Sequence, residues 1–526
     1  MGRRIRREAH FGRMMRCFAE RPSNIDALLR EAMERRPEAT ALVAGDCRMS
    51  YRALDQSVQR IAANLARHGL KRGDRVALLL GNRPEFLLTV LAAARLGAVV
   101  VPMNIRQRRP EIQFMLAHSG ATMLIFESAL ADELPGASEL PDLEHRFVVG
   151  VPSEGAQAFE ALMAPGEKPS FSSPEEEDPF CILYTSGTTG RPKGAVLTHF
   201  GLVHSVMHFE QALGLRVGDV AALAVPASHV TGLVAILLQT LRVAGTTVMM
   251  TEFKAGHFIT LVEREKINYA LMVPAMYNLC LMAPELTTCD LSSWRVGGFG
   301  GAPMPEASVQ RLAAEIPGLG LSNIYGATET SSPVSVLSAA DIADHSDTVG
   351  QILPCAEVIV VNREGQEVET GEVGELLIAG PMTIPFYWNN PEANEGAFIG
   401  GYWRSGDLGS VDAQGYLRIH DRIKDVVNRG GYKIYCIEVE NVISSYPGID
   451  ECAVVGYPDT VLGERVAAFV RGPAAADQAA IREHCAERLS DYKVPEVIMA
   501  LDQPLPRNAN GKVAKNDLRT LVGPGR

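Results

Sequence analysis

The residues best suited to chemistry lie in the segment CILYTSGTTGRPKGAVLTH, residues 181–199. Its glycines let the backbone turn back on itself and aim several N–H groups at one point, which creates an anion site. Its hydroxyl side chains and its lysine add donors, and phosphoryl oxygens bind both kinds. The spacing of a Walker loop is absent. The predicted phosphate-binding residues are Thr185, Ser186, Gly187, Thr188, Thr189, Gly190 and Lys193.

This segment resembles the phosphate loop of the adenylate-forming enzymes, the superfamily of acyl-CoA synthetases, peptide-synthetase adenylation domains and luciferases. The resemblance extends, in order, through residues 222–232, 297–304, 323–330, 402–409, 421–440 and 504–513. It therefore covers nearly the whole chain. It implies that the protein uses ATP to convert a carboxylic acid into an acyl-adenylate, releases pyrophosphate, and passes the acyl group to coenzyme A.

The nucleotide site follows from the same resemblance. In NIYGATET it places Tyr325 against adenine, Thr328 at the α-phosphate and Glu329 on magnesium, and these residue types suit those roles. Asp407 in YWRSGDLG is expected to bind the ribose hydroxyls, and Arg422 in DRIKD to contact ribose or phosphate. The other residues that the resemblance implies for binding ATP or coenzyme A are Gly301, Ala302, Pro303, Asn323, Gly326, Lys424, Gly430, Gly431 and Lys512.

The adenylation lysine is expected at Lys512, in RNANGKV, where an ammonium would bridge the attacking carboxylate and the α-phosphate. Lys424 stands at the family's hinge, about which a C-terminal domain rotates between adenylation and thioester formation. Gly430 and Gly431 lie where the backbone approaches the pantetheine arm of coenzyme A. We expect Cys436, nearby, to be a buried inert thiol. The predicted catalytic residues are Thr185, Lys193, His229, Glu329 and Lys512.

The acid pocket is expected around VPASHVTGL, residues 225–233, where the family has a histidine or aromatic residue at the carboxylate site. The predicted pocket residues are His229, Val230, Leu233, Gly300 and Gly301. Residues 225–233 contain no acidic side chain that could pair with a substrate ammonium, and an unpaired buried ammonium would be costly. We therefore expect an alkyl acid of medium or long chain, or an aryl acid, rather than an amino acid.

Two other functions stay open. The chain could stop at the acyl-adenylate or load a carrier protein, and a comparison of AMP release with and without coenzyme A would separate this from a CoA ligase. It could also be a non-catalytic nucleotide-binding protein. The presence of Lys193, Glu329, Asp407, Arg422 and Lys512 together argues against that function.

The elements that must position these residues alternate between helix and strand. Residues 25–37 and 51–69 have helical periodicity, RVALLL (75–80) is typical of a buried parallel strand, and a helix at 84–96 precedes a strand at 98–104. This predicts an α/β fold in which helices cover mostly parallel sheets.

Two changes of pattern predict the domain organisation. Short strands after about residue 345 predict a β unit, and a smaller α+β pattern begins near residue 425. We therefore predict an N-terminal adenylation domain over 1–423 and a mobile C-terminal lid domain over 424–526.

Composition excludes several classes of protein. With 526 residues, 47% of them hydrophobic and 21% charged, the chain suits a globular protein of at least two domains. The formal net charge of −12 disfavours a nucleic-acid binder. Charged and polar residues interrupt the most apolar stretch, 221–250, so we expect no transmembrane segment.

Nine cysteines without a C-x-x-C pair predict free thiols and a cytoplasmic location, and the sequence leaves a homodimer open. The arginine-rich first 21 residues are expected to form a solvated, poorly ordered or simply basic leader, and an organelle transit peptide stays open as the alternative.

Overall fold

The apolar runs of the first half form a sheet of seven strands, in a computed structural model that describes residues 3–166, 172–185, 192–302, 304, 306–507 and 513–522. All neighbours in this sheet are parallel except β10 and β11. In spatial order the strands are β11 (Lys193–Thr198), β10 (Pro179–Thr185), β6 (Val99–Pro102), β5 (Arg75–Leu79), β7 (Met123–Glu127), β8 (His145–Val149) and β9 (Gln157–Ala158).

A second sheet has nine strands and is parallel from β16 to β3, with antiparallel strands at both edges. Its order is β18 (Gln351–Ile352), β17 (Ser335–Leu337), β16 (Gly320–Tyr325), β15 (Val296–Gly300), β14 (Tyr269–Met272), β12 (Val220–Leu223), β13 (Thr246–Met249), β3 (Thr40–Ala44) and β4 (Cys47–Ser50). The predicted α/β class with mostly parallel sheets is confirmed.

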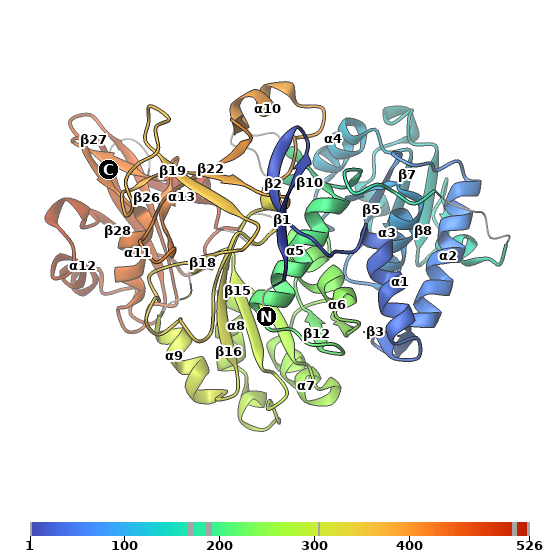
Figure 1. Cartoon of the computed structure of the whole chain (residues 1–526). Helices are drawn as coiled ribbons and strands as arrows, with labels where there is room; N and C mark the ends of the chain where they lie inside the picture. The colour runs from blue at the N-terminus through green and yellow to red at the C-terminus, as the bar shows by residue number, and fades with distance from the viewer. Residues whose placement is uncertain are drawn as a thin grey trace.

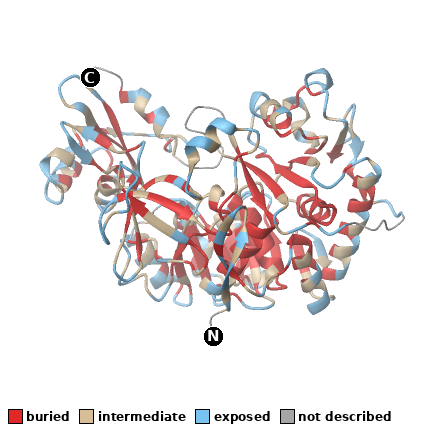
Figure 2. Cartoon of the chain, turned by 45° about the horizontal axis from the view of Figure 1, so that its top comes forward, coloured by how far each residue is buried: buried red, intermediate tan, exposed pale blue. Residues whose placement is uncertain are grey.

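Helices lie between and outside the sheets (Figure 1). They are α1 (Ile25–Arg35), α2 (Tyr51–Arg67), α3 (Pro84–Leu96), α4 (Arg109–Ser119), α5 (His199–Ala212), α6 (Gln239–Arg242), α7 (Ala255–Glu265), α8 (Pro274–Met282) and α9 (Glu306–Glu315). Helix α5 is buried from His199 to Phe209. In Figure 2 the buried residues accordingly gather in the strands and the central helices, while the outer helices expose one face to solvent.

The predicted β unit is an antiparallel sheet of β19 (Glu357–Val361), β20 (Gly374–Ala379), β22 (Tyr402–Val411), β21 (Phe398–Ile399) and β23 (Leu417–Arg422), with helix α10 (Pro391–Ala397) beside it. The smaller C-terminal part lies at one end of the molecule (Figure 1). It consists of β24 (Val427–Arg429), β25 (Tyr432–Ile434), β26 (Glu451–Asp459), β27 (Gly463–Arg471), β28 (Val497–Ala500), α11 (Cys436–Ser444), α12 (Gln478–Ala486) and α13 (Lys515–Val522).

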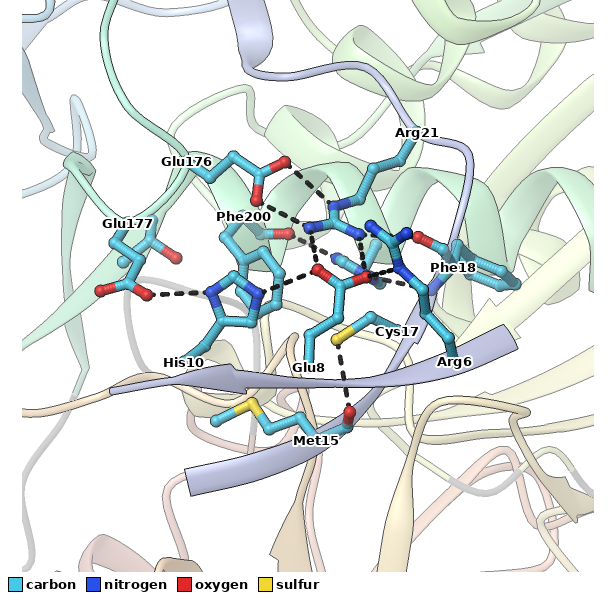
Figure 3. A network of polar contacts seen from close by, with 12 residues as sticks. Arg6, Glu8, His10, Met15, Cys17, Phe18, Arg21, Glu176, Glu177 and Phe200 are labelled. Atoms are coloured by element: carbon cyan, nitrogen blue, oxygen red, sulfur yellow. Dashed lines mark hydrogen bonds and ion pairs between the residues drawn. The ribbon is translucent and has the colours of Figure 1, made fainter. Parts of the chain in front are cut away.

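The expectation of a poorly ordered leader is wrong. Residues Ile5–His10 (β1) and Arg13–Phe18 (β2) form an antiparallel hairpin that packs on α5. The guanidinium of Arg21, 7% exposed, binds both Glu8 (2.8 and 2.9 Å) and Glu176 (3.1 and 2.7 Å), as Figure 3 shows. The buried side chains of Met15 and Cys17 alternate with exposed ones along β2. Paired charge and an apolar face therefore order this basic segment.

In the part of the chain that the structure describes, no helix has both the length and the apolar character needed to cross a membrane.

Candidate active site

Thr185 and Lys193 lie directly opposite one another, at the facing ends of β10 and β11. Between them, Ser186, Gly187, Thr188, Thr189 and Gly190 lie outside the described residues, as do Pro303 and Lys512. The strand pair thus holds both ends of the predicted phosphate loop at one edge of the seven-stranded sheet.

Glu329 lies beside the loop ends and belongs to a short turn of helix, η6 (Thr328–Thr330), after β16. Its Oε1 accepts hydrogen bonds from the Thr185 hydroxyl (3.2 Å) and from the Tyr387 hydroxyl (3.0 Å). The Lys193 ammonium is 5.3 Å from the centroid of the Tyr387 ring. The structure therefore brings three of the predicted catalytic residues, Thr185, Lys193 and Glu329, around one tyrosine.

Asp407 joins the predicted ribose and adenine residues. It is 6% exposed, and its Oδ1 accepts from Arg422 Nε (2.8 Å) while its Oδ2 accepts from the Tyr325 hydroxyl (2.6 Å). Asp407 and Arg422 are paired across β22 and β23, and Tyr325 ends β16. The negative charge of Asp407 raises the pKa of Arg422, and burial together with that charge raises the pKa of Tyr325. Because a carboxylate has about four lone-pair sites, Asp407 can still accept from sugar hydroxyls.

The predicted acid pocket lies at the carboxyl ends of strands of the nine-stranded sheet. His229 follows β12 and precedes a π-helix, η4 (Thr231–Leu238). The Thr231 N–H donates to His229 Nδ1 at 3.3 Å, so in the neutral ring the proton lies on Nε2. Val230 and Leu233 are buried, and Gly300 ends β15. Of the predicted pocket residues, Val230 and Leu233 are thus buried apolar side chains, whereas His229 is only partly buried.

The remaining nucleotide-site residues are spread around the same strand ends. Asn323 lies in β16 and Gly326 follows that strand, whereas Gly301 and the exposed Ala302 follow β15. Thr328 begins η6, one residue before Glu329. The structure therefore places these residues in β16 or just after the carboxyl ends of two neighbouring inner strands, β15 and β16.

The residues predicted for the hinge and the thiol step follow β23. Lys424 is exposed in the turn between β23 and β24, where Arg422 O accepts from Asp425 N–H (2.9 Å). Gly430 and Gly431 form the β24–β25 turn, with φ of 58° and 93°. Cys436 is buried, its thiol donates to Asp425 O (3.1 Å), and burial raises its pKa. The expected burial of Cys436 is confirmed, and its raised pKa disfavours the reactive thiolate.

Two family models match this chain. Residues 29–388 match the AMP-binding enzyme model, and residues 438–512 match that of the AMP-binding enzyme C-terminal domain. A feruloyl-CoA synthase of Amycolatopsis sp is 36% identical over 93% of this chain and 96% of its own. The long-chain-fatty-acid–CoA ligase FadD13 of Mycobacterium tuberculosis is 34% identical over 94% of this chain and 98% of its own.

The chain belongs to the AMP-binding enzyme family.

A solved AMP-binding enzyme has the same fold. The anthranilate CoA ligase AuaEII in complex with anthranoyl-AMP superposes with a TM-score of 0.88 over 95% of this chain and 98% of its own, at 26% identity.

Tyr387 of this AMP-binding enzyme was not predicted from the sequence as a site residue. Besides its bond to Glu329, the Tyr387 hydroxyl accepts from the indole N–H of Trp403 (3.2 Å). Tyr387 forms an isolated bridge with Ala195, next to the phosphate loop. No local pattern in FYWNN distinguishes a site tyrosine from a core one, so only the long-range contact identifies it.

Proposed function

We propose that this enzyme is an acyl-CoA synthetase. A carboxylate oxygen of the acid attacks the α-phosphorus of ATP, the bond to the β-phosphate breaks, and pyrophosphate leaves. The thiol sulfur of coenzyme A then attacks the acyl carbonyl, loses its proton, and displaces AMP. The observation that best supports this proposal is the convergence of Thr185, Lys193 and Glu329 at the ends of the predicted phosphate loop.

Each residue has a role that suits its chemistry. The Lys193 ammonium and the Thr185 hydroxyl donate to phosphoryl oxygens, which need such donors. Asp407 accepts from the ribose hydroxyls while Arg422 and Tyr325 fix its orientation. Lys512 stabilises the charge that develops as two anions meet, an effect of the oxyanion-hole type. His229 orients the acid carboxylate through its Nε2–H.

Magnesium is proposed as the metal, with Glu329 as its protein ligand. Glu329 Oε1 is fixed by two hydroxyl donors, and a carboxylate is the oxygen ligand that Mg²⁺ prefers. Since Mg²⁺ usually binds through one or two carboxylates together with substrate phosphates, one glutamate suffices. The metal would neutralise phosphate charge when bound.

The acid is proposed to be an aryl acid or an alkyl acid of medium or long chain. The pocket wall contributed by Val230 and Leu233 is apolar, and residues 225–233 contain no carboxylate for a substrate ammonium. The similarity to a feruloyl-CoA synthase and to a long-chain-fatty-acid–CoA ligase supports both acid types.

We further propose the division at 423/424, with Lys424 as the hinge about which residues 424–526 rotate. The exposed turn between β23 and β24 supports it, because few residues there need change conformation. A homodimer and a cytoplasmic location stay predictions, the latter supported by nine cysteines that are all free thiols in the structure.

The test is AMP release from ATP with acids of graded chain length and with ring-containing acids, each with and without coenzyme A. We expect release that needs both the acid and coenzyme A, with formation of the acyl thioester confirmed by mass spectrometry. Acid-dependent release that coenzyme A does not change would instead support an enzyme that stops at the acyl-adenylate or loads a carrier protein. Absence of AMP with every acid would contradict the proposal.

A further inference from the structure

Asn82 joins the two large sheets through one buried amide. It follows β5 of the seven-stranded sheet and is 8% exposed. Its two amide hydrogens are donated to Val225 O (3.0 Å) and Met250 O (2.9 Å), and its carbonyl oxygen accepts from Ala227 N–H (2.7 Å). The three backbone partners follow β12 and β13 of the nine-stranded sheet. Asn82 therefore fixes the ends of two neighbouring strands from outside their sheet.

The backbone that Asn82 holds leads directly to His229. Ala227 is two residues before the histidine, and His229 N–H donates to Pro226 O at 3.1 Å. A Cβ at Gly232, in the next turn of chain, would lie 2.2 Å from Pro226 O, so the π-helix η4 packs tightly against this loop and requires glycine there. Because the segment is this short and this closely packed, a shift at Ala227 moves His229.

The side chain of Asn82 also borders a cavity of about 410 Å³ at the same strand ends, whose wall includes Gly81, Arg83, Met249 and Thr251. Atoms next to a space of this size have no neighbours there to restrain them. Asn82 therefore acts on the loop mainly through its three hydrogen bonds, which add to the packing of the buried Ala227.

We propose that Asn82 is a positioning residue that sets the location of His229 and thereby the binding of the acid. The inference rests on the proposed function, because it needs the acid to bind at His229. It predicts that Asn82 affects the acid more than ATP, since the nucleotide residues Asp407, Arg422 and Tyr325 are held by contacts of their own.

Two substitutions separate hydrogen bonding from packing. Asn82→Ala removes the amide. Asn82→Asp keeps its size and the acceptor for Ala227 N–H, but it turns an oxygen without hydrogens toward the carbonyls of Val225 and Met250. The matched control is Asn64→Ala, because Asn64 is a buried amide on α2 that donates to Leu162 O (2.9 Å) and Ala164 O (3.0 Å).

We expect both Asn82 variants to raise the KM for the acid about 10-fold or more, the scale of one or two lost hydrogen bonds, and to change the KM for ATP less than about 3-fold. Asn64→Ala should lower the melting temperature and leave both KM values near wild type. Hydrogen exchange on the full chain without substrate gives a second readout: the Ala227 amide should exchange about 10-fold faster in Asn82→Ala, which loses its acceptor, and at an unchanged rate in the Asn64→Ala control.

Unchanged exchange at Ala227, an Asn82→Asp variant that behaves as wild type, or an equal rise in both KM values would overturn the inference. The KM values can be measured only if the wild type is active, so the KM outcomes would overturn the inference on Asn82 and leave the proposed function intact. A wild type that releases no AMP with any acid would overturn the proposed function and, with it, the link between Asn82 and the acid.

Discussion

The hydroxyl of Tyr387 donates a 3.0 Å hydrogen bond to Oε1 of Glu329, and the two residues are 58 positions apart in the chain. Burial and the charge of Glu329 raise the pKa of Tyr387, so the hydroxyl keeps its proton and remains a donor. The ring of the same tyrosine lies near the Lys193 ammonium. Tyr387 thus links the predicted metal ligand to the predicted phosphate loop.

Replacing this hydroxyl should impair adenylation. A hydrogen bond to a charged group contributes about 1.5–3 kcal/mol, so Tyr387→Phe should lower the kcat of acid-dependent ATP–pyrophosphate exchange about 10- to 100-fold. The control is Tyr51→Phe, which removes a buried hydroxyl bonded to Gly245 O (2.7 Å) on α2. Tyr51→Phe should lower the free energy of unfolding and leave the kcat of exchange near wild type. A kcat for Tyr387→Phe within about 2-fold of wild type would show that Glu329 needs no such partner.

Asp407→Asn should weaken ATP binding. The substitution removes the charge that pairs with Arg422 and one acceptor for ribose, so the KM for ATP should rise about 10-fold or more. Asp347→Asn is the matched control. Asp347 forms an ion pair (2.6 Å) with Arg418, which lies in β23 as Arg422 does, but the Asp347 side chain is 65% exposed. Steady-state kinetics at varied ATP should leave the control near wild type; an equal rise in both variants would point to a general effect of charge.

Three buried histidines on α5 make stability depend on pH. Burial lowers the pKa of His199 to about 4 and those of His204 and His208 to about 3. The unfolded chain binds these protons below about pH 6.5 and the folded chain does not, so the free energy of unfolding should fall as pH decreases from 6.5. Each histidine contributes up to about 1.4 kcal/mol per pH unit.

Melting temperatures at pH 7, 6 and 5 measure this dependence. His208→Gln keeps an acceptor for the Cys355 N–H, which His208 Nε2 binds at 3.3 Å, but it cannot take up a proton. The variant should therefore lose less stability than wild type between pH 7 and 5. Equal losses in the two proteins would mean that His208 is protonated in the folded state.

The N-terminal hairpin should depend on Arg21. Removing this guanidinium leaves Glu8 and Glu176 without the partner that they share in a partly buried cluster of ion pairs. We expect Arg21→Ala to expose residues 3–20 to limited proteolysis while the rest of the chain stays folded. Arg6→Ala, which removes an ion pair whose arginine is 56% exposed, should change the cleavage little. Equal protection of the hairpin in all three proteins would contradict its anchoring by Arg21.

The sequence predicts an element well where a local residue marks its end. Helix α3 has the predicted bounds 84–96 because Pro84 begins it and Gly97 ends it in the left-handed conformation. The hairpin was missed because seven arginines in the first 21 residues are typical of a solvated segment. The contacts of Arg21 with Glu176 come from residues 155 positions apart, and no local pattern contains them.

In the site, too, residues within motifs were predicted and residues that act only through long-range contacts were not. Asp407 and Arg422 were expected together because the resemblance places both at the nucleotide, and the β22–β23 register brings them into contact. Tyr387 and Asn82 belong to no phosphate or acid motif. Their roles depend on strands that meet only in the folded chain, so sequence reasoning had no signal for them.

Acid-dependent exchange of pyrophosphate into ATP measures formation of the acyl-adenylate. We expect the wild type to catalyse this exchange with an aryl or alkyl acid. Lys512→Ala should lower the exchange rate about 10²-fold, by analogy with the loss of one oxyanion donor. Exchange by Lys512→Ala within a few-fold of wild type would contradict the role of Lys512, and no wild-type exchange with any acid would contradict acyl-adenylate formation by this chain.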